Sequence, residues 1–167
     1  MNIEDRKQYS GQLVSIHKAT EEDSKDIWIW RNDEKTRKMF TSTEEVSWEA
    51  HKIWYDISLK NKNRYLFVGI LEPENKIGIC RFDINEKTNI AEISININPN
   101  YRNKKLSELL LRNSIIFLHK QTKVDLLAAI KKNNLSSIQC FKNNGFVIFK
   151  EDSNYNFYIK KYSDHQN

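Results

Sequence analysis

The chain has 167 residues with a formal net charge of +5, and 39% of its residues are hydrophobic against 29% charged. We therefore expect residues 1–167 to form a single globular domain, which excludes disordered, collagen-like and low-complexity chains. No apolar run approaches the roughly 18 residues that cross a bilayer, and Met1 to Ser10 is too polar for a signal peptide, so we expect a cytoplasmic protein without membrane partners.

The N-terminal third predicts one strand followed by two helices. Leu13 to His17 alternates apolar and polar residues, which is typical of a strand. Thr20 offers an N-cap hydroxyl with Asp23 three residues later, so a helix is expected to run toward Asn32. A second helix is expected from Ser47, because apolar and aromatic residues return at helical spacing, namely Trp48, His51, Ile53, Trp54, Ile57 and Leu59.

Three strands follow with short polar turns between them. Tyr65–Leu71 and Ile77–Ile84 are rich in β-forming residues and flank a hairpin turn, 72–75. The third strand, Ala91–Asn98, alternates isoleucines with polar residues, so one of its faces is polar. Pro99 is expected to end it.

The rest of the chain predicts two more helices and three more strands. Apolar residues recur at helical spacing over 106–120, and a short apolar run, Val124–Ile130, is typical of a buried strand. This strand, helix and strand imply a parallel crossover. A short helix is expected after 133–137 and ends at Gly145, and residues 146–149 and 156–159 form two closing strands.

Cysteine usage and charge distribution exclude two classes of function. Cys80 and Cys140 lie in no disulfide or zinc-binding pattern, so both are expected to be reduced, buried thiols. The basic residues are mixed with acids instead of forming a block, so no nucleic-acid partner is expected. A small polyanionic ligand explains the excess positive charge equally well.

Three segments in order carry a resemblance to a known family: 91–99 as a central strand, 101–107 as a basic loop before a helix, and 133–146 as a last motif. Together they resemble the GNAT superfamily of acyl-CoA-dependent N-acyltransferases. The resemblance implies an α/β (α+β) fold with a mixed central sheet of about seven strands and about four flanking helices. It also implies acetyl-CoA as the acyl donor.

The resemblance assigns the coenzyme site to the loop, the helix start and the central strand. A helix N-terminus offers free amides and a positive dipole end to a pyrophosphate. The family loop has two small residues, and Lys105 and Ser107 stand at those positions here. The family tyrosine that protonates the thiolate is replaced by Phe141, which has no hydroxyl. The expected coenzyme contacts are Ile95, Asn96, Ile97, Arg102, Asn103, Lys104, Lys105, Leu106, Ser107, Asn134 and Phe141.

Glu92 is the candidate general base, because acyl transfer needs a neutral amine and Glu92 lies near the start of the strand that binds the acyl group in this family. The alternative is an exposed strand carboxylate paired with a lysine. The expected acceptor contacts come from the N-terminal half and the second strand: Trp30, Arg31, Asn32, Trp48, His51 and Arg81.

Segments 30–33 and 47–51 resemble a GNAT subgroup that acetylates nucleotide-linked amino sugars, and also the ribosomal-protein alanine N-acetyltransferases. Arginine and aromatic side chains suit a diphosphate and a flat base, so the sequence favours a small amine on a nucleotide sugar. Two alternatives stay open: a protein N-terminal acetyltransferase, and a GNAT-fold binding module without turnover. Exposed strand edges also allow a homodimer.

Overall fold

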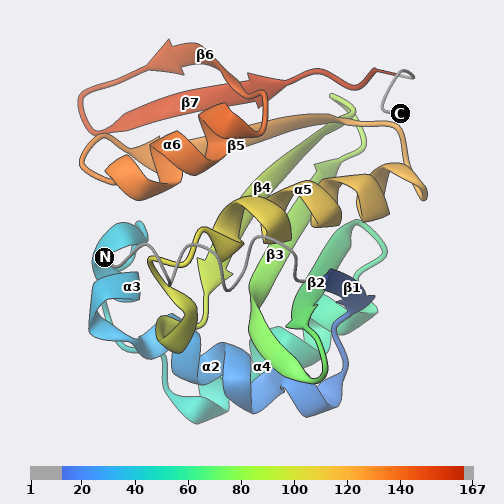
Figure 1. The fold of residues 1–167 in the computed structure, drawn as a ribbon, viewed down its shortest axis with the longest axis vertical. Helices are drawn as coiled ribbons and strands as arrows, with labels where there is room; N and C mark the ends of the chain where they lie inside the picture. The colour runs from blue at the N-terminus through green and yellow to red at the C-terminus, as the bar shows by residue number, and fades with distance from the viewer. Residues whose placement is uncertain (1–12, 164–167) are drawn as a thin grey trace.

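In the computed structural model, which describes residues 13–163, seven strands form one sheet in the order β1-β2-β3-β4-β5-β7-β6 (Figure 1). The strands are β1 Val14–Lys18, β2 Arg64–Leu71, β3 Asn75–Asn85, β4 Ile90–Ile97, β5 Asp125–Lys131, β6 Val147–Glu151 and β7 Tyr155–Lys160. Their neighbours are the α-helices α2 Ser24–Asn32, α3 Glu34–Met39, α4 Trp48–Lys60, α5 Leu106–His119 and α6 Leu135–Asn143, with short 3-10 turns η1 Glu21–Asp23 and η2 Pro99–Tyr101.

The expected mixed α/β sheet of seven strands is confirmed. Strands β4 and β5 run parallel, as the crossover through α5 predicted, and every other pair in the sheet is antiparallel. The helix starts at Thr20 and Ser47 and the cap at Gly145, with φ of +81°, also lie where the sequence placed them. The prediction missed one helix, α3, which the structure shows between α2 and α4.

Helices cover the two faces of the sheet unequally. On one face α5 packs over β1–β4, and Phe67, Cys80 and Phe82 lie in the core beneath it. On the other face α2 and α4 pack against β2 and β3 through a smaller cluster that includes Leu66 and Val68. The alternation of strand side chains therefore divides the core between two layers of helices. Cys80 and Cys140 are both buried free thiols, as expected.

Strands β4 and β5 diverge after a short parallel contact. Their pairing covers only three positions, from Ile90 opposite Asp125 to Glu92 opposite Leu127. Beyond Glu92, β4 stays paired with β3, whereas β5 pairs with β7. The edge of β4 that faces away from β3 therefore presents unpaired backbone N–H and C=O groups from Ile93 onward, and these groups are available to a ligand.

In residues 13–163, no helix has the length and apolar character needed to cross a membrane.

Candidate active site where two strands diverge

A cavity of about 290 Å³ lies beside the diverging part of β4. Its walls come from α3, β4, η2 and the loop after it, the start of α5, and α6 with its N-cap. The residues that line it are Lys35, Thr36, Met39, Phe40, Ile95, Asn96, Ile97, Tyr101, Arg102, Asn103, Lys105, Leu106, Ser107, Asn134, Ser136, Ser137 and Cys140. Most residues predicted to contact the coenzyme are therefore brought together in one place.

The loop before α5 keeps the backbone shape that small residues normally provide. Asn103 and Lys105 have φ of +62° and +57°, in the left-handed region that favours glycine. Lys105 occupies the N-cap of α5, and its own side chain makes no capping hydrogen bond within residues 13–163. The first amides of α5 are therefore not occupied by a capping side chain and can donate to an anion. The replacement of a small residue by Lys105 has not removed the local geometry.

Arg102 lines this cavity, but its guanidinium is bound to another element. Its Nη2 donates to Asp33 Oδ1 and, at 2.6 Å, to Thr36 Oγ1. Burial would raise the pKa of Asp33, but hydrogen bonds from Arg102 and the Thr36 amide, together with the Arg102 charge, hold that pKa below its ordinary value. Asp33 is therefore an ionised partner, and the predicted role of Arg102 in binding pyrophosphate competes with this pair.

Helix α6 presents a different residue to the cavity from the one predicted. Phe141 is buried in the core, where its ring lies 4.9 Å from that of Phe146, so it does not line the cavity with the other predicted coenzyme contacts. Cys140 lines the cavity instead, and burial raises the pKa of its thiol to about 11. Asn134 keeps its predicted place, and its side chain caps α6 by accepting from the Ser137 amide.

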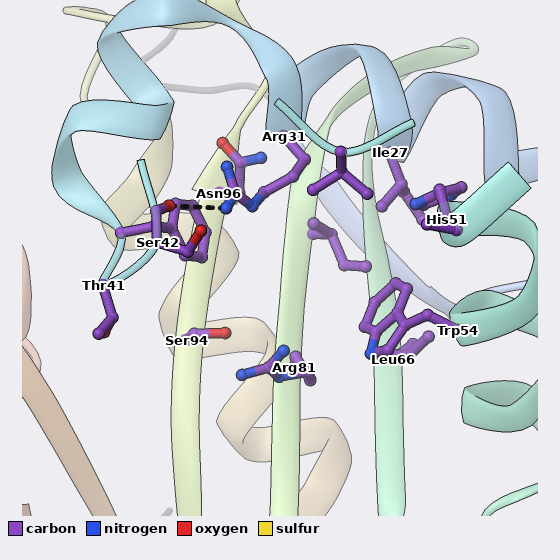
Figure 2. A pocket seen from close by; sticks show the side chains of 14 residues that line it. Ile27, Arg31, Thr41, Ser42, His51, Trp54, Leu66, Arg81, Ser94 and Asn96 are labelled. Carbon is purple, nitrogen blue, oxygen red and sulfur yellow. Dashed lines mark hydrogen bonds between the residues drawn. The ribbon is translucent and has the colours of Figure 1, made fainter. Parts of the chain in front are cut away.

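A second cavity, of about 470 Å³, lies on the other side of β4 (Figure 2). It is bounded by α2, the segment 40–46, α4 and the facing side chains of β2, β3 and β4. Its lining is Ile27, Arg31, Phe40, Thr41, Ser42, Val46, Ala50, His51, Trp54, Leu66, Ile79, Arg81, Ser94 and Asn96. This lining contains two arginines and no acidic side chain.

The two arginines have different partners. Arg31 Nη2 donates to the Ser42 carbonyl at 2.9 Å, and its guanidinium lies 4.4 Å from the Phe40 ring centre. Its Nη1 is buried and has no acceptor in residues 13–163, and burial and the charge of Arg37 lower its pKa. Arg81 pairs with Asp83, which also pairs with Arg64. One carboxylate thus serves two arginines, and the cavity keeps a net positive charge.

Three of the residues predicted for the acceptor do not line this cavity. Trp30 is 4% exposed and belongs to the core under α2, away from the lining of this cavity. Asn32 binds both the amide and the carbonyl of Val46, which fixes the segment 40–46 in place. Trp48 packs edge to face on Trp28. These residues shape the pocket from behind instead of touching its contents.

His51 does line the second cavity, as predicted, but as an aromatic wall. Its Nε2 lies 2.9 Å from the Ser24 carbonyl and must donate to it, and its ring stacks on Tyr55. Burial lowers its pKa, an effect that the hydrogen bond to Ser24 opposes, so the imidazole is neutral at pH 7. Trp54 continues the same wall (Figure 2).

The two cavities share Phe40 and Asn96 in their linings. Thr36 Oγ1 lies 3.4 Å from Asn96 Oδ1, so α3 contacts the strand at this junction. Glu92 lines neither cavity and has an exposed side chain, but it shares the polar face of β4 with Ser94 and Asn96. A two-residue step along a strand is about 7 Å, so its carboxylate can reach the acceptor cavity at Ser94 directly or through one water.

Sequence reasoning missed the walls that α3 and the segment 40–46 supply, namely Lys35, Thr36, Met39, Phe40, Thr41 and Ser42. A signal for α3 was present. Asp33 caps the helix by accepting from the Thr36 amide, Glu34 lies in its first turn, and basic residues lie in its last turn. The helix has only six residues, too few for its hydrophobic periodicity to stand out.

The described residues, 13–163, hold no cluster of histidine, cysteine and acidic side chains that could bind a metal ion. Lys104 is the one predicted coenzyme residue of the loop that lies outside the first cavity's lining, and its ammonium lies 5.0 Å from the Tyr101 ring centre.

Comparison with known proteins gives a consistent result. The family model of the acetyltransferase (GNAT) domain matches residues 14–147. Acetyltransferase PseH of Campylobacter jejuni is 24% identical over 153 residues, which cover 91% of this chain and 94% of PseH.

Solved structures show the same fold. A domain from Methanocaldococcus jannaschii superposes with a TM-score of 0.77 at 24% identity, covering 89% of this chain and 98% of that one. Spermidine N-acetyltransferase from Vibrio cholerae, in complex with CoA and spermine, gives 0.76 at 16% identity, covering 87% and 92%.

Proposed function

This chain belongs to the GNAT acetyltransferase family and is an acetyl-CoA-dependent N-acetyltransferase, and we propose that its acceptor is the amine of a nucleotide-linked amino sugar. In this assignment the first cavity holds the coenzyme arm and the second holds the acceptor. The relative PseH, which is an acetyltransferase, supports acetyl transfer, and sequence resemblance to the amino-sugar subgroup supports the substrate class.

The observation that carries the proposal is the charge of the acceptor cavity. Arg31 and Arg81 face it, no acidic side chain lines it, and Arg31 Nη1 is buried without an acceptor in residues 13–163. A polyamine such as the spermine bound to the Vibrio cholerae structure carries several positive charges, which these arginines repel. An acceptor with a diphosphate supplies the acceptor oxygens that guanidinium groups bind well.

The cavity also fits the rest of such a molecule. Its volume of about 470 Å³ is within the range of small-molecule sites. The walls formed by Trp54 and His51 offer flat aromatic surfaces, and Ser94 and Thr41 offer hydroxyls. These groups suit a base or sugar ring and its hydroxyls.

The chain's own residues prepare the reacting groups. The thioester of acetyl-CoA supplies the acyl group, and the unpaired edge of β4 near Ile95 to Ile97 can donate amide hydrogens to its carbonyl oxygen. Glu92 then accepts the amine proton through water, while a C–N bond forms and the C–S bond breaks.

The departing thiolate does not receive its proton from residue 141, where the family has a tyrosine, because Phe141 has no hydroxyl and is buried. The Cys140 thiol, whose pKa is raised to about 11, lies in the same cavity as a neutral group. We assign the proton to solvent that enters the coenzyme cavity.

The proposal is tested by thiol release from acetyl-CoA with a panel of amines. The panel contains a uridine-diphosphate-linked 4-amino sugar, the same amino sugar without its nucleotide, an alanine-terminated peptide and spermidine. We expect turnover with the nucleotide sugar and at least a hundredfold lower kcat/KM without the nucleotide. Preference for the peptide would support the N-terminal acetyltransferase instead, and no thiol release with any amine would support a binding module.

A further inference from the structure

The basic side chains of the loop that was expected to bind phosphate make other contacts in the structure. Of the loop's basic residues, Arg102 is paired with Asp33 and Thr36, and Lys104 lies over Tyr101. Swinging Arg102 toward a pyrophosphate would leave the ionised Asp33 unpaired beside that anion. The structure therefore needs another source of positive charge for the phosphates of acetyl-CoA.

Two lysines meet this need. Lys35 on α3 and Lys105 at the start of α5 both line the coenzyme cavity. Neither has an ion pair with an acidic side chain in residues 13–163, whereas Lys38 on the same helix is paired with Glu34 at 2.6 Å. Lys35 and the start of α5 come from different elements and line the same cavity, so an anion bound there can meet both the lysine charge and the α5 amides.

Helix α3 is held at this cavity by the contacts that occupy Arg102. Asp33 caps α3 through the Thr36 amide at 2.9 Å and pairs with Arg102 of the loop. Thr36, which is 8% exposed, receives a hydrogen bond from Arg102 and contacts Asn96 of β4. The helix is therefore tied to both the loop and the strand that bound the cavity.

We propose that Lys35, together with Lys105, binds the phosphates of acetyl-CoA, and that Arg102 is a positioning residue that holds α3 at the coenzyme cavity. This assignment rests on the use of acetyl-CoA, which family membership establishes, and not on the identity of the acceptor. One phosphate contact, Lys35, thus comes from the six-residue helix α3 and not from the loop.

The test compares two acyl donors by direct binding. Acetyl-CoA carries the phosphates, and S-acetylpantetheine carries the same thioester arm without them. Lys35→Ala is expected to raise the dissociation constant of acetyl-CoA about tenfold, to reduce its salt dependence, and to leave S-acetylpantetheine binding unchanged. Lys38→Ala is the matched control on the same helix, since its side chain lines neither cavity, and we expect no change from it.

Arg102→Ala separates a positioning role from a phosphate contact. If Arg102 positions α3, this variant weakens both donors, because Met39 and Phe40 of the shifted wall line the same cavity. Acetyl-CoA loses more than S-acetylpantetheine, because the shifted helix also carries Lys35. A loss confined to acetyl-CoA would overturn the positioning role. Equal acetyl-CoA binding by Lys35→Ala and Lys38→Ala would overturn the role of Lys35. Neither outcome depends on the acceptor, so the proposed function is tested separately.

Discussion

The two cavities that share Asn96 differ in the chemical groups that line them. The coenzyme cavity combines the unpaired backbone of β4 and the first amides of α5 with apolar and basic side chains such as Phe40, Lys35 and Lys105. The acceptor cavity is formed by large side chains from α2, α4, β2 and β3, including Arg31, Trp54 and Arg81. The backbone part of the coenzyme cavity tolerates a change of side chain, as the left-handed conformation of Lys105 shows, whereas in the acceptor cavity each residue contributes its own charge and shape.

The largest expected effect comes from Glu92, on the strand that borders both cavities. Glu92→Gln removes the base without changing size, so kcat is expected to fall at least a hundredfold while acetyl-CoA binding stays the same. Thiol-release kinetics and calorimetry measure the two quantities. Glu86→Gln, on an exposed turn, is the control and should have no effect. An unchanged kcat would show that Glu92 is only an exposed strand carboxylate.

The acceptor cavity should depend on one particular charge. Arg31→Met keeps the aliphatic stem but removes the guanidinium, so kcat/KM for the nucleotide-linked amino sugar is expected to fall about fiftyfold, with coenzyme affinity unchanged. Arg37→Met is the control, because Arg37 lies near Arg31 but outside the cavity lining. Equal losses from the two variants would contradict a direct contact between Arg31 and the acceptor.

The loop at the coenzyme cavity should affect stability through its backbone conformation. Lys105→Gly relieves a left-handed conformation that a lysine adopts at a cost, so the free energy of unfolding is expected to rise by about 1 kcal/mol. Asn103→Gly is the comparison at φ of +62°, where a smaller gain is expected because asparagine tolerates this region better. Denaturant unfolding measures both changes. A loss of stability in Lys105→Gly would contradict the account of this loop.

The smallest effect concerns the pair that ties α3 to the loop. The pKa of Asp33 is lower in the folded protein than its ordinary value of 3.8, so the pair's contribution to stability is present above that value. The contribution is lost as the pH falls through the lower, folded-state pKa. Wild type should be more stable than Asp33→Asn at pH 7, and the two should converge in acid. A difference that does not depend on pH would contradict an ionised Asp33.

The sequence predicted the coenzyme side better than the acceptor side, for a physical reason. Strand alternation over 91–98, the N-cap at Asn134 and the αL position at Gly145 are local signals, and each element appeared where it was expected. Which residues face a cavity depends on tertiary packing. Trp30 is buried in the core, and Cys140 lines the coenzyme cavity whereas Phe141 does not. Arg102 donates a hydrogen bond to Asp33, which lies 69 residues away in the sequence.

The most direct test of the account is thermal unfolding of the protein with and without acetyl-CoA. A ligand that binds only the folded state raises the unfolding midpoint according to its affinity and concentration. We predict a clear rise with acetyl-CoA and with CoA, because the α5 amides and the left-handed loop are preserved despite Lys105 and Ser107. An unchanged midpoint at millimolar coenzyme would contradict a working coenzyme cavity in this chain.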